Sequence, residues 1–282
     1  MKTVGPPRYG AGMAELRTYP PGVTCWIDTE QPDPAAARDF YGGLFGWHLT
    51  GSDYLIATLD GQEVAAVGRA AGGPARWNTY VAVEDADAAA ATARAAGGTV
   101  TAEPRDRGQG ARVAECRDPA GAEFRLWQAL GRPGAQLVNT PGAWNFADLR
   151  TPDLDAAMAF YRPAFGWVAA DLGQGAGVML RVPGYGDHLA ATVDPGIHQR
   201  QSAAPPGFAD VIGGVLLGEP ASWQVTFAVT DRDTTAAAAD KRGATVVASA
   251  DNLWNRTALI RDPQGAEFTV SQFTPPEGDW DQ

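Results

Sequence analysis

Three stretches of this chain occur twice, in the same order. The segment 32–47 (PDPAAARDFYGGLFGW) recurs at 152–167 (PDLDAAMAFYRPAFGW), and 117–124 (RDPAGAEF) recurs at 261–268 (RDPQGAEF). Between these landmarks, 77–83 (WNTYVAV) corresponds to 223–229 (WQVTFAV). Ordered matches of this kind indicate an internal duplication. The 282 residues therefore form two similar halves, a length that suits two domains of ordinary size.

Each half shows the same succession of strand and helix signals. After the β-prone stretch 23–29, we expect a helix with Asp33 as N-cap, Pro34 in its first turn and Gly46 just past its end. Strands are expected at 54–59 and 63–68 around the turn Asp60-Gly61, and later at 77–83, near 99, at 112–115 and at 123–128, with an Ala-rich helix at 86–96. The pattern predicts an α+β protein whose halves each contain two β-α-β-β-β modules.

Composition excludes several kinds of partner. The net charge is −11 and no basic run offsets it, so nucleic acid and anionic membrane surfaces are poor partners. Every apolar stretch is shorter than the ~20 residues that span a bilayer, and residues 1–20 form an arm without the apolar segment of a secretory signal. We expect a cytoplasmic monomer or homodimer. Cys25 and Cys116 are too few for a disulfide framework and are expected to be buried thiols.

The D-P-x-G turn before the last strand and the F-Y…F-G-W end of the first helix, repeated at the same spacing, carry a family resemblance. The chain resembles the vicinal oxygen chelate superfamily of glyoxalases and bleomycin-resistance proteins, in its two-domain actinobacterial type. The resemblance implies two tandem domains, each with a sheet curled into a cup. The implied divisions are an arm at 1–20, a first domain at 21–130, a linker at 131–143, a second domain at 144–275 and a tail at 276–282.

Metal-using members of that superfamily carry metal ligands at three strand positions of a cup. The resemblance places these positions at Trp26, Asn78 and Arg125 in the first cup, and at Phe146, Gln224 and Thr269 in the second. Only Gln224 could be a ligand, through a weak carbonyl oxygen. We therefore expect no metal and no other cofactor. The three histidines lie outside these positions and are expected at the surface or in loops: His48, His188 and His198.

Strand alternation adds further side chains to each cup. Asp28, Tyr80, Glu123 and Trp127 join the first cup, and Asp148, Thr226, Glu267 and Ser271 join the second. The first cup is thus expected to be the more aromatic and the more charged. Trp47 and Trp167 are expected in the core. For Trp26, Trp127 and Trp144, stacking on a flat ligand and plain core packing both remain open. Arg125 is either a ligand contact or the partner of Glu123 in an internal ion pair.

The halves differ in one length. Trp47 and Trp77 are 30 residues apart, whereas Trp167 and Trp223 are 56 apart. The extra residues fall mainly in 195–222, whose apolar centre consists of Phe208, Val211, Ile212, Val215 and Leu216. Loops of this length in a compact domain are usually functional or disordered. We expect a lid over one cup, with Phe208 at the ligand; a mobile surface loop or a dimer contact are the alternatives.

Two functions are compatible with these features. The first is a metal-independent protein that binds a bulky aromatic small molecule of antibiotic or polyketide type, for sequestration, self-resistance or biosynthesis, as the resemblance implies. The second is a cofactor-independent hydroxylase, lyase or isomerase in which Asp28, Glu123, Asp148 or Glu267 acts as a base. A metal-dependent glyoxalase comes third. Binding without turnover is the preferred hypothesis, because the metal ligands are replaced and an aromatic residue stands at one of their positions. No nucleophile triad or phosphate-binding motif supports a more definite enzymatic mechanism.

Overall fold

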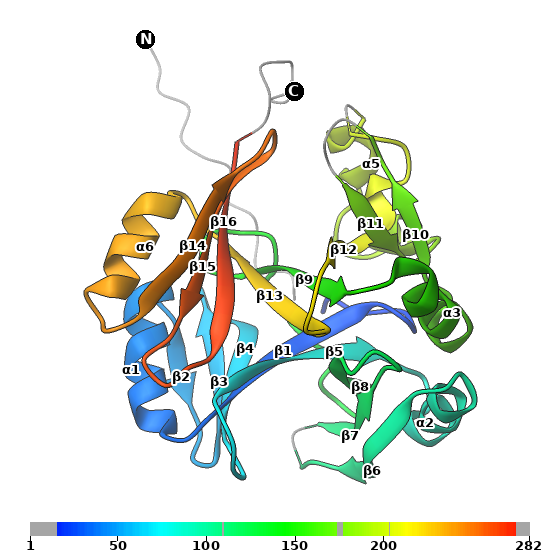
Figure 1. Ribbon diagram of the computed structural model, residues 1–282, viewed down its shortest axis with the longest axis horizontal. Helices are drawn as coiled ribbons and strands as arrows, with labels where there is room; N and C mark the ends of the chain where they lie inside the picture. Colours follow the sequence, from blue (N-terminus) through cyan, green and yellow to red (C-terminus); the bar gives the residue numbers. More distant parts are fainter. Residues whose placement is uncertain (1–15, 109, 174–176, 203, 275–282) are drawn as a thin grey trace.

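Two curved sheets of eight strands, one from each half, make up the frame of the protein. The computed structural model describes residues 16–108, 110–173, 177–202 and 204–274. The strand orders are β2-β3-β4-β1-β5-β8-β7-β6 and β10-β11-β12-β9-β13-β16-β15-β14. Both modules of a half therefore join in one sheet, through the antiparallel pairs β1–β5 and β9–β13. The two sheets open in opposite directions (Figure 1).

The first half follows the predicted order of elements. It consists of β1 (Thr24–Gln31), α1 (Pro34–Phe45), β2 (His48–Thr50), β3 (Tyr54–Leu59), β4 (Gln62–Arg69), β5 (Arg76–Ala82), α2 (Ala86–Ala95), β6 (Thr99–Asp106), β7 (Ala111–Arg117) and β8 (Glu123–Ala129).

The second half repeats that order with additions between its third and fourth strands. It consists of β9 (Trp144–Thr151), α3 (Leu154–Phe165), β10 (Val168–Asp171), β11 (Val178–Arg181), α4 (Tyr185–Ala191), α5 (Ile197–Arg200), the 3-10 helix η1 (Phe208–Asp210), β12 (Val211–Leu217), β13 (Ser222–Ala228), α6 (Arg232–Asp240), β14 (Thr245–Asp251), β15 (Asn255–Arg261) and β16 (Glu267–Phe273). The α+β fold with four β-α-β-β-β modules is confirmed.

The expected start and end of α1 are observed. Asp33 accepts hydrogen bonds from the backbone N–H groups of Ala35 and Ala36, and Pro34 lacks the donor that would otherwise be unsatisfied there. Gly46 ends the helix at φ 74°, a left-handed conformation that glycine adopts without strain. Asp60 and Gly61 also have positive φ, which joins β3 to β4 by a tight hairpin turn.

The apolar centre of segment 195–222 is a strand and not part of a lid. β12 pairs with β11 on one side and with β9 on the other, in the place that β4 occupies in the first sheet. The expectation was wrong for 211–217 because a short run of apolar residues fits a buried strand as well as a loop. The additional residues are 182–210, which join β11 to β12 where Asp60 and Gly61 suffice in the first half.

Each of the helices α1 and α3 packs against the sheet of the other half. The ring of Phe45 in α1 lies 4.8 Å from that of Phe227 in β13, and Phe165 in α3 lies 5.6 Å from Phe124 in β8. In Figure 1, α1 accordingly stands beside α6, and α3 beside α2. Burying such rings contributes roughly 1.5–3 kcal/mol each. The halves are thus joined through a shared core.

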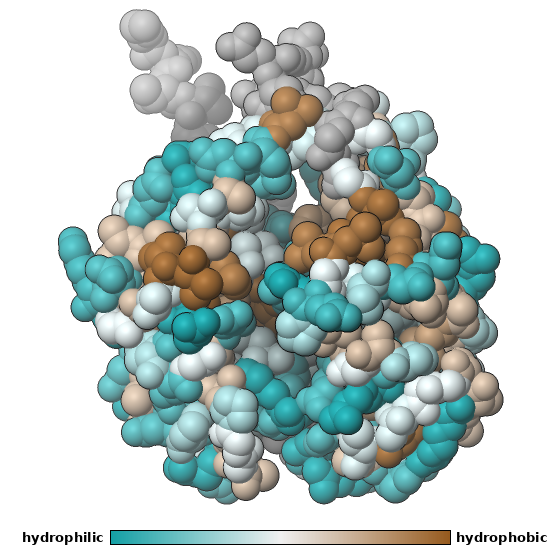
Figure 2. All heavy atoms as spheres, viewed as in Figure 1, coloured by the Kyte–Doolittle hydropathy of each residue, from teal (hydrophilic) through white to brown (hydrophobic). Residues whose placement is uncertain are grey.

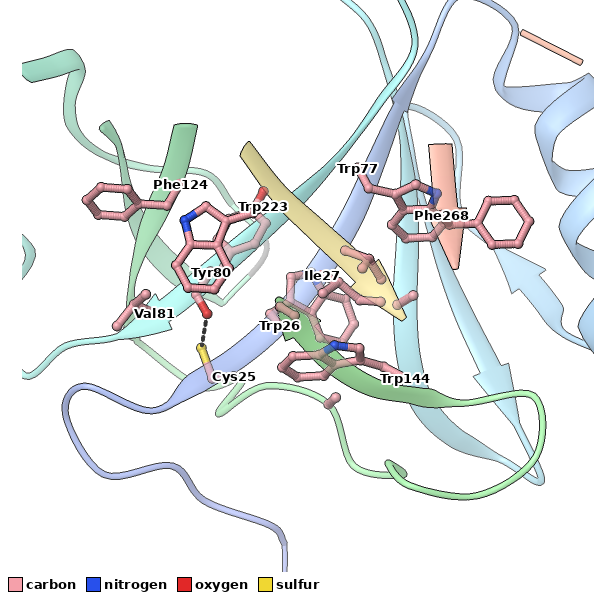
Figure 3. Close-up of a cluster of buried hydrophobic side chains, with 14 of the residues drawn as sticks. Cys25, Trp26, Ile27, Trp77, Tyr80, Val81, Phe124, Trp144, Trp223 and Phe268 are labelled. Atoms are coloured by element: carbon pink, nitrogen blue, oxygen red, sulfur yellow. Dashed lines mark hydrogen bonds between the residues drawn. The ribbon is translucent and has the colours of Figure 1, made fainter. Parts of the chain in front are cut away.

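That core includes tryptophans from both halves (Figure 3). Trp144 of β9 is 4% exposed and belongs to the same buried cluster as Trp26 of β1. Trp47 and Trp167 are buried as expected, and their indole N–H groups donate to the carbonyls of Gly142 and Gly22, each at 2.7 Å and each in the opposite half.

Several smaller expectations concern cysteines, the chain ends and membranes. Cys25 and Cys116 are free and buried, and burial raises the pKa of Cys116 to about 12. Residues 1–15 of the expected arm and the whole tail at 276–282 lie outside the described residues. Among those described, no helix combines the length and apolar character needed to cross a membrane.

Candidate functional site

One face of each sheet is covered by helices and the other is concave. On the covered face, the Trp77 indole N–H donates to Tyr41 of α1 at 3.1 Å, and that of Trp223 donates to Tyr161 of α3 at 3.3 Å. Side chains alternate along a strand, so the neighbours Asn78 and Gln224 point to the concave faces. The first cup is the concave face of β1–β8, and the second cup is that of β9–β16.

A closed hydrogen-bond network occupies the floor of the first cup. Asp28 is 2% exposed and accepts from Asn78 Nδ2 at 2.7 Å, from the Tyr54 hydroxyl at 2.9 Å and from the Tyr80 hydroxyl at 2.5 Å. Arg125 donates to the Tyr80 oxygen at 2.8 Å and its Nη1 lies 3.5 Å from Asp28 Oδ1. The carboxylate of Asp28 is therefore already fully engaged by the protein.

Trp26 and Trp127 are packed within the same region. They are 0% and 1% exposed, with ring centroids 5.9 Å apart, and Trp127 meets the Tyr80 ring edge-on at 5.3 Å. Their N–H groups donate to the Tyr54 hydroxyl and to the Arg132 carbonyl, both at 2.9 Å. A flat ligand could stack on Trp26 only after one of these side chains moved.

Arg125 forms an internal ion pair, but not with Glu123. Its guanidinium donates to Glu30, while Glu123 pairs with Arg76 at 2.7 Å and with Arg117 at 2.6 Å. Burial opposes the ionisation of Glu30, yet the guanidinium groups of Arg125 and Arg76 hold the pKa of Glu30 below its usual value. The expected partner was wrong because sequence proximity does not reveal which strand lies opposite.

Two cavities border the first cup. One, of about 200 Å³, is lined by charged groups that pair with one another, among them Arg76, Glu123 and Arg125. It is smaller than the roughly 300–1,000 Å³ of typical small-molecule sites. The other, of about 1020 Å³, is a solvent-open space at the hairpin tips, to which β3 contributes Tyr54 and Ile56. Neither exposes the floor residues Trp26 and Asp28.

The second cup carries smaller side chains at the same positions. The repeats align Trp26, Tyr80, Arg125 and Trp127 with Phe146, Thr226, Thr269 and Ser271. Met179 of β11 corresponds to Ile56 of β3, so Gly177 stands at the position that Tyr54 occupies in the first cup. Phe146, Gln224, Thr269 and Ser271 all remain partly exposed. Figure 2 shows the surface hollowed between the β10–β12 and β14–β16 arms, and the floor of the second cup is the more exposed of the two.

Asp148 lies in the middle of the second cup. It accepts from the Gly214 N–H at 2.7 Å and from the Thr226 hydroxyl at 3.2 Å, and no cation pairs with it among the described residues. Burial raises the pKa of its carboxyl above the ordinary value, and these two hydrogen bonds only partly oppose the shift. Of the four expected bases, Glu123 and Glu267 are exposed and paired with arginines, and Asp28 is engaged. Of the four, only Asp148 combines partial exposure with the lack of any cationic partner in the described residues.

The family assignment follows from the whole chain. A model of the glyoxalase-like domain matches residues 25–127 and again 145–271, one copy on each sheet. The chain belongs to the glyoxalase-like domain family. These two matches coincide with the duplicated halves, and the fold is that of the vicinal oxygen chelate superfamily, as the sequence resemblance implied.

Two curated relatives align with nearly the full chain. The protein CFP32 of Mycobacterium tuberculosis, provisionally described as a glyoxylase, is 34% identical over 278 residues, covering 93% of this chain and 99% of CFP32. The anthracycline biosynthesis protein DnrV of Streptomyces peucetius is 34% identical over 285 residues, covering 92% of this chain and 96% of DnrV.

Solved structures share the arrangement of the sheets. The Mn(II)-bound glyoxalase from Novosphingobium aromaticivorans matches with a TM-score of 0.59 at 16% identity, over 94% of this chain and 86% of that one. The 2,3-dioxygenase LapB from Pseudomonas sp. KL28 matches with a TM-score of 0.57 at 12% identity, over 95% and 97%. At such identities the likeness extends to the fold alone.

The donor groups of this glyoxalase-like protein do not fit a metal ion. Arg125 places a cation beside Asp28 in the first cup, and the second cup offers the neutral side chains Gln224 and Thr269 beside Asp148. No three His, Cys, Asp or Glu side chains converge anywhere in the described chain. Divalent ions need several anionic or imidazole donors, which neither cup supplies.

The remaining candidates lie at the edge of the fold. Phe208 belongs to η1 and is partly exposed in the connection to β12. His48 and His198 are exposed, and His188 of α4 lies 3.1 Å from the Thr18 hydroxyl. Sequence reasoning missed Tyr54, whose hydroxyl links Trp26 to Asp28. Tyr54 lies in the strand predicted at 54–59, but only the order of strands in the sheet shows that this strand lies near β1.

Proposed function

We propose that this protein binds a bulky aromatic small molecule in the second cup, without a metal ion, as part of the biosynthesis or handling of an antibiotic-type compound. The observation that carries the proposal is the difference between the cups. Large side chains fill the first, whereas Thr226, Thr269, Ser271 and Gly177 leave the second open beside Phe146. An apolar wall with a few polar groups is typical of small-molecule sites.

The relatives suggest the kind of molecule. DnrV and DauV, which are 34% and 32% identical to this chain, are named as anthracycline biosynthesis proteins. An anthracycline contains a flat, fused aromatic ring system with several oxygens. Phe146 and Met179 offer an apolar surface for such rings, and Gln224 and Thr269 offer hydrogen bonds to oxygens.

To test this proposal, the second cup is filled by substituting the large side chain that occupies the equivalent position of the first cup. Ser271→Trp introduces the tryptophan that Trp127 supplies in the first cup, and Ser271→Ala is the matched control. Binding of anthraquinone-2-carboxylate, followed by its absorbance, should weaken by at least about tenfold in Ser271→Trp and stay within about twofold in Ser271→Ala. Prior treatment with EDTA should leave the affinity unchanged. Failure of the unmodified protein to bind the probe, or equal binding by Ser271→Trp, would refute the proposal.

Asp148 favours one alternative, a cofactor-independent enzyme acting in the same cup. A carboxylate whose pKa is raised by burial accepts a proton more readily than an ordinary aspartate, as a lyase or isomerase reaction requires of its base. Under this alternative, the bound molecule is converted and Asp148→Asn abolishes conversion while retaining binding. Mass spectrometry of the molecule recovered after incubation separates the two functions: unchanged ligand supports binding alone.

A further inference from the structure

The two cups differ in the charges on their concave faces as well as in the size of their side chains. In the first cup, Glu30 follows Asp28 by two residues and is neutralised by Arg125 and by Arg76, the latter at 3.1 Å. The repeat places Arg150 at the position of Glu30. The charge at this point is therefore reversed in the second cup.

The groups around Arg150 do not compensate its charge. The positions of Arg125 and Arg76 hold Thr269 and Ser222, and Ser222 lies opposite Arg150 in the pair β9–β13. Within the described chain, Arg150 forms no ion pair, and its buried Nε has no hydrogen-bond acceptor. A guanidinium placed on a concave surface with a donor left unsatisfied is an incomplete anion site.

Arg150 shares the concave face with the groups already assigned to the ligand. Leu149, its neighbour on β9, is fully buried on the helix-covered face, so Arg150 points the same way as Asp148 and Phe146. Leu216, opposite Arg150 on β12, is 41% exposed and adds apolar surface beside it. A cation, a carboxyl of raised pKa and an apolar wall thus follow one another along β9.

A second arginine lies at the other end of the cup. Arg181 of β11 is next to Leu180, which is fully buried, and two residues from Met179, so it faces the cup. Its Nε is also buried without an acceptor. The connection 182–210 approaches it at Gly207, where a Cβ atom would lie 1.9 Å from Arg181 Nη1. The strand registers place Arg181 beside Val211 and Arg150 beside Leu216, five residues apart on β12.

We propose that the ligand of the second cup is an acidic aromatic molecule whose carboxylate is bound by Arg150. The inference rests on the proposed function and specifies its ligand class. Arg150 supplies the paired N–H donors that match a carboxylate. The aromatic rings extend along the cup over Asp148 towards Phe146, with Arg181 at the far end.

Two matched probes test the charge of the ligand. Anthraquinone-2-carboxylate and anthraquinone-2-carboxamide have the same rings and nearly the same shape, but only the first is an anion at neutral pH. The protein should bind the carboxylate at least about tenfold more tightly than the amide. Equal affinities overturn the inference and leave the proposed function standing. Binding of neither probe removes the proposed function itself.

Variants of Arg150 then test whether this residue causes the preference for the carboxylate. Arg150→Gln should reduce affinity for the carboxylate by about tenfold or more and affinity for the amide by less than about threefold, whereas Arg150→Lys should restore part of the preference. Arg261→Gln is the control, because Arg261 is half-exposed and paired with Glu267 at 2.7 Å. A preference that persists in Arg150→Gln overturns the assignment of Arg150. If that variant does not fold, as judged by circular dichroism, the loss of preference is read from Arg150→Glu and Arg150→Met, and a preference unaltered in whichever of them folds overturns the assignment equally.

Discussion

At the scale of single residues, Asp28 and Asp148 show how neighbours assign roles to equivalent groups. Both stand two positions after the first metal-ligand position of their cup, on equivalent strands. Asp28 is held by three side-chain donors and an arginine, and it organises a closed core. Asp148 has two donors and no cation, and burial raises its pKa. Asp28 therefore has a structural role, and Asp148 is the carboxyl that the proposed ligand of the second cup contacts.

Trp26 illustrates the structural role. Trp26→Ala should leave a cavity among Trp127, Tyr54 and Tyr80 and lower the free energy of unfolding by about 3–5 kcal/mol, measured by urea denaturation. Trp26→Phe should cost less. Because the ring is fully buried in the first cup, neither change should alter the affinity of anthraquinone-2-carboxylate by more than about twofold if the protein stays folded. A stable Trp26→Ala protein with strongly weakened binding would instead favour stacking on Trp26.

The raised pKa of Asp148 predicts a dependence of stability on pH. In the unfolded chain this carboxyl has a pKa of about 3.9, and in the folded protein its pKa is higher. Ionisation is therefore less favourable in the folded state, and the contribution of Asp148 to stability falls as pH rises through the folded pKa. Asp148→Asn should become more stable relative to the original protein as the pH rises above about 4, as followed by urea unfolding at several pH values. A difference independent of pH would contradict this, and Glu267→Gln at the exposed rim is the control.

At the scale of elements, β12 and the connection before it have separate roles. Deleting 195–222 removes β12, which bridges β11 and β9, so that variant should not give a folded protein. Replacing only 198–206 by a Gly-Ser linker of equal length retains the strand and the buried Ile197. This second variant should fold, as judged by circular dichroism.

The linker variant also tests the lid. If the connection covers the second cup, anthraquinone-2-carboxylate should dissociate several-fold faster from the variant in stopped-flow experiments. An unchanged dissociation rate would show that the connection 182–210 does not act as a lid. Its α4 contacts the segment before β1, because the Tyr185 hydroxyl accepts a hydrogen bond from Arg17 at 3.4 Å.

At the scale of the whole molecule, the exchange of helix contacts makes the halves interdependent. Tyr41 of α1 donates to Asp262 at 2.7 Å, and Tyr161 of α3 donates to Asp118 at 3.0 Å. Both aspartates belong to the repeated D-P-x-G turns of the opposite half, so the motifs that identify the duplication also connect its copies.

The shared core predicts one cooperative unfolding transition for the two halves. Urea unfolding followed by far-UV circular dichroism and by tryptophan fluorescence should give coincident curves. Residues 21–130 expressed alone should fail to fold, because the apolar face of α1 would lose Phe227 and Phe268. Two separated transitions, or a stable isolated half, would show that each half folds on its own.

The sequence determined the repeat, the module order and most element boundaries. Helix α1 could be predicted because its signals are local: an Asp N-cap, a proline in the first turn and a glycine at the end. The location of Asn78 and Arg125 on the concave face of the first sheet was also predictable, because landmarks of fixed spacing place each residue along its strand. Strand alternation then assigned the faces correctly.

Only the tertiary structure decided which cup is closed. Trp26 and Arg125 look like binding residues in the sequence, and their partners Tyr54 and Glu30 become visible only when β3, β1 and β8 are placed in order. Whether a side chain binds a ligand or fills the core depends on whether neighbouring strands satisfy its polar atoms and cover its surface. Those neighbours are distant in sequence, and no local pattern encodes them.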